Sequence, residues 1–180
     1  MISISKDVKL RVITLDDQAR LHELMHRIYP PFYRHLWVNE DCNWYMNFCY
    51  SMVNLQNELS EPQSEYYFVY YKENLNGILR FKYNSTLEHS FSKNTAYLHR
   101  IYLGEESHGK GVAKVLFDWV DKKAKENGQS GIWLEAMDTQ IQALKFYEKC
   151  NYIIKNTRVL NFERIHEKYR GMIILYKSLI

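Results

Sequence analysis

The sequence predicts an α/β (α+β) fold in which a mixed, mostly antiparallel sheet of about seven strands carries helices on both faces. Two observations lead to this prediction. Strand-like and helix-like segments alternate along the chain, and the last two strand-like segments, 152–160 and 172–179, are separated by a short loop typical of a hairpin. The chain has 180 residues and shows no repeat or linker, so we expect one domain spanning residues 1–180.

The first half of the chain predicts a strand, two helices, two further strands and a polar loop, in that order. Asp16 or Asp17 can begin the first helix, and Pro30-Pro31 ends it. Asn76-Gly77 is expected to form the tight turn between the two later strands, because this dipeptide favours hairpin turns. The other expected positions are 8–14 for the first strand, 41–59 for the second helix, 66–71 and 78–83 for the paired strands and 85–95 for the loop.

The segment 98–113 is the most informative, because a strand runs through a glycine turn into a helix. Gly109 and Gly111 follow the strand, and apolar residues recur at helical spacing from Val112 until Asn127-Gly128 ends the helix. A helix that begins at such a turn presents unpaired backbone N–H groups and the positive end of its dipole. This arrangement is typical of an anion site, and phosphate is the usual anion.

A second strand and helix follow in 131–152. Residues 131–137, GIWLEAM, predict a strand, and Asp138-Thr139 is expected to cap the short helix that contains Phe146 and Tyr147.

Both segments resemble the Gcn5-related N-acetyltransferase (GNAT) superfamily. Its first signature is Gln or Arg, two residues, Gly, one residue, then Gly or Ala, and residues 106–113 read ESHGKGVA, with Glu106 at the first position. Its second pattern is Asn, two residues, Ala, two residues, Phe-Tyr, three residues, Gly-Phe. Residues 140–152 read QIQALKFYEKCNY, so Gln140 replaces Asn and Asn151-Tyr152 replaces Gly-Phe. Asn is the next best residue for a left-handed helix end.

The resemblance implies that acetyl-CoA is the co-substrate and that no metal takes part. The turn amides would hold the pyrophosphate, with glycines where the ligand comes too close for a Cβ, and the strand backbone would pair with the pantetheine arm. The implied cofactor-binding residues are Ile101, Tyr102, Leu103, His108, Gly109, Lys110, Gly111, Val112, Ala113, Gln140 and Tyr147.

The implied reaction is transfer of the acetyl group to a primary amine of a small molecule or peptide, by direct attack on the thioester. Tyr147 matches the family's frequent general acid, because a phenol with a pKa of about 10 stays protonated at neutral pH. For the base, His99 lies two residues before Ile101 on one strand face, and Glu135 on the next strand is an alternative. Each of these residues is also compatible with a purely structural role.

The acceptor site is expected between residues 29–50 and 163–169, where members of this superfamily wall it. The first range is rich in aromatic residues, which favour cationic amines, and the chain is broadly similar to diamine and polyamine acetyltransferases. The simpler interpretation is that most of these rings pack the helices onto the sheet, and we favour it.

Three alternatives stay open. His22-Glu23-Leu24-Met25-His26 fits the H-E-x-x-H pattern of a zinc hydrolase, without a defined third ligand. Residues 104–111 resemble a P-loop, except that Gly111 stands where Ser or Thr should hold magnesium. The substitutions at Glu106 and Gln140 also allow a CoA-binding regulatory module without catalysis.

Composition adds weaker constraints. A net charge of +3 indicates neither a nucleic-acid nor a membrane partner, and no apolar run is long enough to span a bilayer. Cys42, Cys49 and Cys150 are few and unevenly spaced, which is typical of reduced cysteines. We therefore expect a soluble cytoplasmic protein, and the resemblance allows a homodimer because many relatives are dimers.

Overall fold

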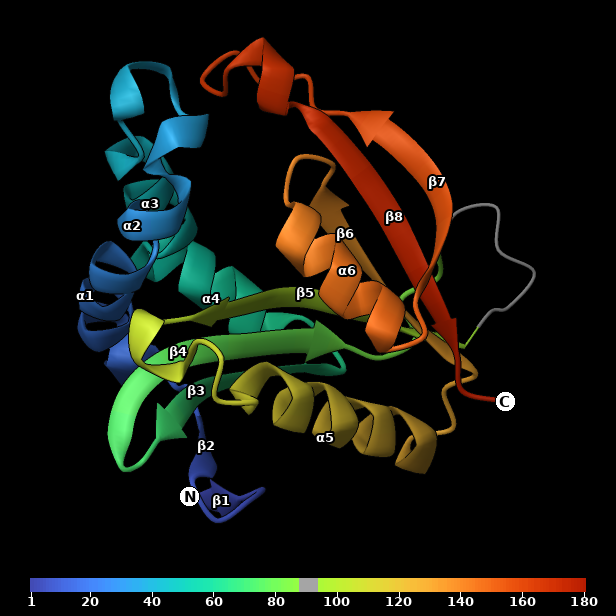
Figure 1. Cartoon of the computed structure of the whole chain (residues 1–180). Coiled ribbons are helices and arrows are strands. Elements are labelled where there is room, and N and C mark those ends of the chain that lie inside the picture. Colours follow the sequence, from blue (N-terminus) through green and yellow to red (C-terminus); the bar gives the residue numbers. More distant parts are fainter. Residues whose placement is uncertain (88–93) are drawn as a thin grey trace. The chain divides into compact units, whose positions relative to one another are not determined.

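The structure is a computed structural model that describes residues 1–87 and 94–180 (Figure 1). The loop expected at 85–95 falls partly on residues 88–93, which lie outside the described residues. The helices are α1 (Gln18–Ile28), α2 (Pro30–Tyr33), α3 (Asn43–Cys49), α4 (Met52–Ser60), α5 (Val112–Glu126) and α6 (Ile141–Lys149). The strands are β1 (Ile2–Ser3), β2 (Val8–Val12), β3 (Ser64–Tyr71), β4 (Asn74–Lys82), β5 (Thr95–Leu103), β6 (Gly131–Met137), β7 (Ile153–Val159) and β8 (Gly171–Ser178).

The strands form an eight-stranded mixed sheet, and the predicted α/β fold class is confirmed. Their order is β1-β2-β3-β4-β5-β6-β8-β7, with β5 and β6 parallel and β2–β3, β6–β8 and β7–β8 antiparallel. The expectation of seven strands missed β1, whose two residues are too few to show alternation. The strand and helix expected around the glycine turn appear as β5 and α5, and the predicted C-terminal hairpin is formed by β7 and β8.

The chain divides into two compact units. Unit one comprises residues 1–81 and 100–116, and unit two comprises residues 82–99 and 117–180. Strand β5 therefore contributes its first residues to unit two and its last residues to unit one. In unit one, the apolar faces of α1 and of strands β2 to β4 supply most of the core, including Leu10, Leu21, Met25, Phe68 and Phe81.

Unit two has a core built from β6 and from the inner faces of its neighbours. Ile132 and Leu134 are buried on β6 while Trp133 and Glu135 alternate to the opposite face. Antiparallel pairing places Leu134 opposite Leu175 of β8. Strand β7 pairs with β8 and forms one edge of the sheet, and its residues are exposed along its whole length.

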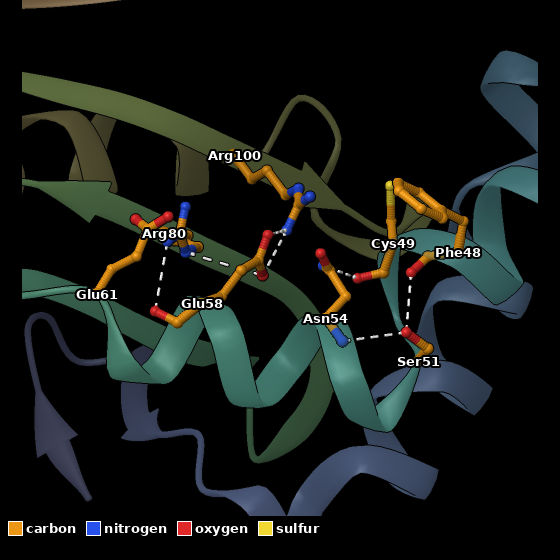
Figure 2. Close-up of polar contacts among 8 residues, drawn as sticks. All are labelled: Phe48, Cys49, Ser51, Asn54, Glu58, Glu61, Arg80 and Arg100. Atoms are coloured by element: carbon orange, nitrogen blue, oxygen red, sulfur yellow. Dashed lines mark hydrogen bonds and ion pairs between the residues drawn. The ribbon is translucent and has the colours of Figure 1, made fainter.

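The helix predicted over 41–59 is wrong as a single element, because the chain breaks at Ser51 into α3 and α4. Ser51 has extended backbone angles, its Oγ accepts the amide of Asn54 at 3.1 Å, and its hydroxyl donates to the carbonyl of Phe48 (Figure 2). Asn54 Nδ2 also donates to the carbonyl of Cys49 at 2.6 Å. Ser51 thus begins a new helix as its N-cap, which is the role that serine performs best.

The hairpin turn predicted at Asn76-Gly77 is also wrong. The chain reverses at Lys72 and Glu73, both of which have positive φ, and Asn76 and Gly77 lie inside β4. A Cβ at Gly77 would overlap the carbonyl oxygen of Tyr102. The glycine is therefore used for a close approach of two backbones rather than for a turn.

A buried ion pair fixes α4 in unit one. Arg100 Nη1 of β5 donates to both carboxylate oxygens of Glu58, at 2.6 and 2.8 Å, and the two side chains are no more than 9% exposed (Figure 2). A second buried guanidinium, that of Arg80, lies 3.8 Å from Glu58 and donates to Glu61 at 2.8 Å. Buried charges need such partners, because taking a single charge out of water costs several kcal/mol.

This pair predicts a strong stability effect. Glu58→Gln keeps the shape of the side chain but leaves the Arg100 charge without its counter-ion, so we expect a loss of about 3–5 kcal/mol in the free energy of unfolding. Urea unfolding followed by circular dichroism measures this change. Glu126→Gln is the control, because Glu126 and its partner Lys122 are both exposed, at 51% and 73%, and such pairs contribute at most about 1 kcal/mol. Equal small losses in both variants would contradict a stabilising role for the buried pair.

Candidate functional site

The predicted anion turn lies in unit one between the end of β5 and the start of α5. After β5 ends at Leu103, residues 105–107 form a short 3-10 helix, and α5 begins at Val112. Gly109 and Gly111 have φ values of 69° and 77°, and a Cβ at either position would meet nothing within 4 Å. The glycines are therefore needed for their left-handed backbone, and the protein itself leaves open space beside them.

The amides of this turn are available to a ligand. Within the part of the chain that the structure describes, the backbone N–H groups of Gly109, Gly111, Val112 and Ala113 donate to no protein acceptor, whereas Lys110 N–H bonds to the Ser107 carbonyl. Gly109, Lys110 and Gly111 are exposed. Unpaired amides at the positive end of a helix favour a phosphate.

The turn is anchored by β4 and α1. The Gly104 amide donates to the Asn76 carbonyl at 2.7 Å, and Asn76 Nδ2 donates to Glu106 Oε2 at 2.6 Å. Arg27 Nη1 donates to the other oxygen of Glu106 at 3.1 Å. A Cβ at Gly104 would lie only 2.7 Å from Glu106, so this glycine permits the arrangement. The acidic residue at the variable motif position thus holds the turn in place.

The pKa of the Glu106 carboxyl lies below its ordinary value. The largest cause is a hydrogen bond from its own backbone amide. Partial burial opposes this effect, and the contacts with Asn76 and Arg27 add to the lowering. Glu106 is therefore a carboxylate at neutral pH.

His108 and Lys110 flank the free amides and are both exposed. The His108 Nε2 lies 3.3 Å from the Leu103 carbonyl oxygen, and its ring centroid is 4.6 Å from that of Phe32. Both contacts belong to unit one, so His108 is already held against the end of β5. Lys110 remains the cation closest in sequence to the two left-handed glycines.

The aromatic residues of 29–50 form a packed cluster in unit one, as we favoured. The ring centroid of Tyr29 lies 4.7 Å from that of Tyr33 and 5.5 Å from that of Tyr102, and Trp37 Nε1 donates to the Tyr29 hydroxyl. Tyr29 and Trp37 are almost fully buried, and burial raises the pKa of Tyr29 far above its ordinary value. These phenols therefore stay neutral and pack the helices around the end of β5.

The base candidates lie in unit two on one face of β5 and β6. Tyr97 and His99 share this face of β5, with ring centroids 5.4 Å apart, and Tyr97 stacks on Trp133 of β6 at 3.9 Å. The Glu135 carboxylate accepts two hydrogen bonds from Arg158, at 2.6 and 3.0 Å, and one from the Tyr97 hydroxyl at 3.2 Å. Glu135 is therefore held in a bidentate ion pair.

The acid candidate Tyr147 belongs to a cluster of rings in unit two. Its ring centroid lies 5.7 Å from that of Phe117, 5.9 Å from that of Phe146 and 6.2 Å from that of Tyr152. Helix α6 begins after Gln140, which is its N-cap, so the expectation that Asp138-Thr139 caps this helix is wrong. Asn151 has a φ of 66°, in agreement with its predicted left-handed role.

The zinc pattern places His22 and His26 on one side of α1, with their Nε2 atoms 3.2 Å apart. Burial, followed by the neighbouring His22, lowers the pKa of His26. Over residues 1–87 and 94–180, no group of three His, Cys, Asp or Glu side chains is placed to hold a metal ion. In the same ranges, no helix is long and apolar enough to cross a bilayer, and the three cysteines are free and buried.

The sequence reasoning missed the partners that organise these groups. Arg27 and Asn76, which hold Glu106, lie 79 and 30 residues away from it, and Glu58 lies 42 residues from Arg100. Arg100 is the residue that could have indicated such a partner. An arginine on an apolar strand is expected to be buried, and a buried arginine requires an acidic partner.

Comparison with known proteins gives a family for the chain. The model of the family described as "Acetyltransferase (GNAT) family" matches residues 19–152. A curated protein of Lactobacillus delbrueckii subsp. lactis, described as an uncharacterized N-acetyltransferase in the pepI 3' region, is 27% identical over 93 residues. That match covers 52% of this chain and 54% of the relative, so the chain spans about half the length of this curated protein.

Solved structures share the fold over nearly the whole chain. The PaiA N-acetyltransferase of Thermoplasma acidophilum, in complex with coenzyme A, has a TM-score of 0.71 at 19% identity and covers 95% of this chain and 98% of its own. The spermidine N-acetyltransferase of Vibrio cholerae, in complex with CoA and spermine, has a TM-score of 0.69 at 18% identity and covers 97% of each chain.

The Glu106 anchor predicts a pH-dependent contribution to stability. Because the folded pKa is lowered, the stabilisation is present at neutral pH and is lost as the pH falls through that pKa. We expect Glu106→Gln to lower the free energy of unfolding by less than about 1 kcal/mol at pH 7, since the pair with Arg27 is half exposed. In urea titrations the difference from wild type should shrink below pH of about 4. Glu105→Gln is the control and should have no effect, and a difference that persists in acid would contradict the role of the charge.

Proposed function

Because the chain belongs to the GNAT acetyltransferase family, we propose that it transfers an acetyl group from acetyl-CoA to a primary amine of a small molecule or peptide. The observation that carries this proposal is the turn before α5. There the left-handed Gly109 and Gly111 leave a run of backbone amides exposed and without protein acceptors in the described chain.

The pyrophosphate of the cofactor is assigned to these amides. Backbone N–H groups and the helix dipole both favour a doubly charged ligand. Lys110 and His108 are placed to add side-chain contacts to the phosphates. We assign the pantetheine arm to the backbone of 101–103, and Gln140 at the start of α6 completes the proposed cofactor contacts.

The chemistry is aminolysis of a thioester. A neutral amine attacks the acetyl carbonyl, its nitrogen loses a proton, and the carbon–sulfur bond breaks to release the thiolate of CoA. A backbone N–H near Leu103 would stabilise the oxyanion. Tyr147 would protonate the departing sulfur as general acid, because a phenol keeps its proton at neutral pH.

We propose His99 as the proton acceptor, acting directly or through water. Glu135 is the other candidate, but its carboxylate already accepts two hydrogen bonds from Arg158 and one from Tyr97. These contacts occupy both carboxylate oxygens, so Glu135 has little room to accept a hydrogen bond from an incoming amine. The Glu135 side chain is therefore better suited to hold Tyr97 on the face that it shares with His99.

A cationic amine is the acceptor that the site residues favour. The rings of Tyr33 and Tyr102, which are only partly buried, lie 5.5 Å apart at the end of β5, and aromatic faces attract cations. The structural neighbour from Vibrio cholerae was solved with spermine, which supports a polyamine-like substrate class. We also propose that residues 1–180 act as one acetyltransferase domain in the cytoplasm.

Calorimetric titration with acetyl-CoA tests the cofactor assignment. We expect saturable binding near one molecule per chain, with ATP plus magnesium as the ligand that gives no response. Gly111→Ala should weaken acetyl-CoA binding by at least about tenfold, because an alanine resists the left-handed backbone that aims the amides. Gly128→Ala is the matched control, since Gly128 has a φ of 68° and equal free space but lies after α5.

Equal loss of affinity in the two glycine variants would argue against the turn as the cofactor site. Absence of acetyl-CoA binding to the wild type would remove the basis of the transferase proposal, together with the roles of His99 and Tyr147. Binding without release of CoA thiol in an amine screen would favour the regulatory alternative, for which the departures at Glu106 and Gln140 leave room.

Tyr147→Phe tests the general acid. Removing the hydroxyl should lower kcat by about 10²–10⁴-fold, as expected for loss of acid catalysis, while acetyl-CoA affinity stays unchanged. Thiol release measured under saturating amine gives kcat. Tyr152→Phe is the control: its hydroxyl belongs to the same ring cluster and has no hydrogen-bond partner among the described residues. Unchanged turnover in Tyr147→Phe would exclude this residue as the acid.

A further inference from the structure

Two histidines outside the transferase machinery lie close together on α1. The Nε2 atoms of His22 and His26 are 3.2 Å apart, and the ring centroids are separated by 4.3 Å. The Nε2 atom of His22 is also 2.8 Å from Oδ1 of Asn47 on α3. Two ring nitrogens and one amide oxygen, all within unit one, therefore converge where α1 and α3 meet.

As the Asn47 amide is oriented, with its oxygen toward His22, hydrogen bonds do not satisfy all three atoms. A neutral imidazole nitrogen carries either one proton or one in-plane lone pair. If the His22 Nε2 carries a proton and donates it to Asn47, it offers no lone pair to His26. If it is unprotonated, its lone pair can accept from His26 but then faces the lone pairs of the Asn47 oxygen. Each tautomer leaves one of the two short contacts without a hydrogen bond of its own.

A divalent transition-metal ion would satisfy all three atoms at once. Zinc binds imidazole nitrogen at about 2.0–2.1 Å, so two nitrogens at the observed separation of 3.2 Å subtend an angle of about 100° at the ion. This angle is close to tetrahedral. The two histidines are only half buried and Asn47 is exposed, so water can reach the remaining coordination positions.

We propose that His22, His26 and Asn47 form a surface site for a late first-row divalent metal ion such as Zn²⁺ or Ni²⁺. Two imidazoles select this class over Mg²⁺ and Ca²⁺, which prefer oxygen ligands. The site differs from a zinc-hydrolase centre because its third ligand is a neutral amide and the described residues add no further His, Cys, Asp or Glu. A bound ion would link α1 to α3. Tyr29 directly follows α1, Tyr45 lies on α3, and their rings are in contact within the aromatic cluster.

Calorimetry of tag-free protein with ZnCl₂ and NiCl₂ tests the site. We expect one saturable ion per chain, weakened at least tenfold by His22→Ala or His26→Ala, and less by Asn47→Ala. His166→Ala is the control, because this exposed histidine lies in the loop before β8 and should leave binding unchanged. Zinc should also raise the thermal unfolding temperature of the wild type and of His166→Ala, but not of His26→Ala, since a ligand stabilises the state that binds it.

Wild-type binding no tighter than that of the His22→Ala and His26→Ala variants would overturn the proposal. Should either variant fail to fold by circular dichroism, the imidazole NMR resonances of the wild type decide the question. Zinc-induced shifts confined to His22 and His26 support the site, and shifts elsewhere or none refute it. These measurements do not involve acetyl-CoA, so they test the metal site independently of the transferase proposal.

Discussion

The ion pair between Glu58 and Arg100 is the contact on which unit one depends. A guanidinium in the second half of β5 faces the interior, where it has lost most of its water, and the Glu58 carboxylate is the group that makes this burial tolerable. Because both carboxylate oxygens accept from one Nη atom, the pair also fixes where α4 meets the strand. The end of this same strand leads into the turn before α5, so the buried pair lies on the strand that carries the proposed cofactor site.

The anion site proposed at this turn requires little side-chain chemistry. Its donors are backbone amides, and its shape comes from two glycines whose conformation other residues resist. What surrounds the turn is specific to this chain: Glu106, usually Gln or Arg in the family, is neutralised by Arg27 and held by Asn76. The acidic substitution is therefore compatible with a phosphate ligand, because its charge is already paired.

Local signals in the sequence were sufficient where one residue type serves one purpose. The glycines before α5, the alternation of β6 and the C-terminal hairpin were all predicted, as was the left-handed Asn151. The failures occurred where a residue has two uses. Ser51 can lie inside a helix or begin one, and Gly77 can turn a chain or admit a neighbouring backbone, so only tertiary contacts decide between them. The candidate site shows the same limit. The glycine motif predicts the free amides of the turn, but no local pattern predicts that Arg27 and Asn76 hold Glu106.

Asn76, which lies inside β4 and not in a turn, constrains which residues can occupy position 106. Asn76 bonds the turn through its main chain and through its side chain, which reaches Glu106, while Arg27 reaches the same carboxylate from α1. A change of Glu106 to Arg would place two cations together and leave the amide of Asn76 facing a donor. Arg27, Asn76 and Glu106 are thus expected to vary as a set among homologues.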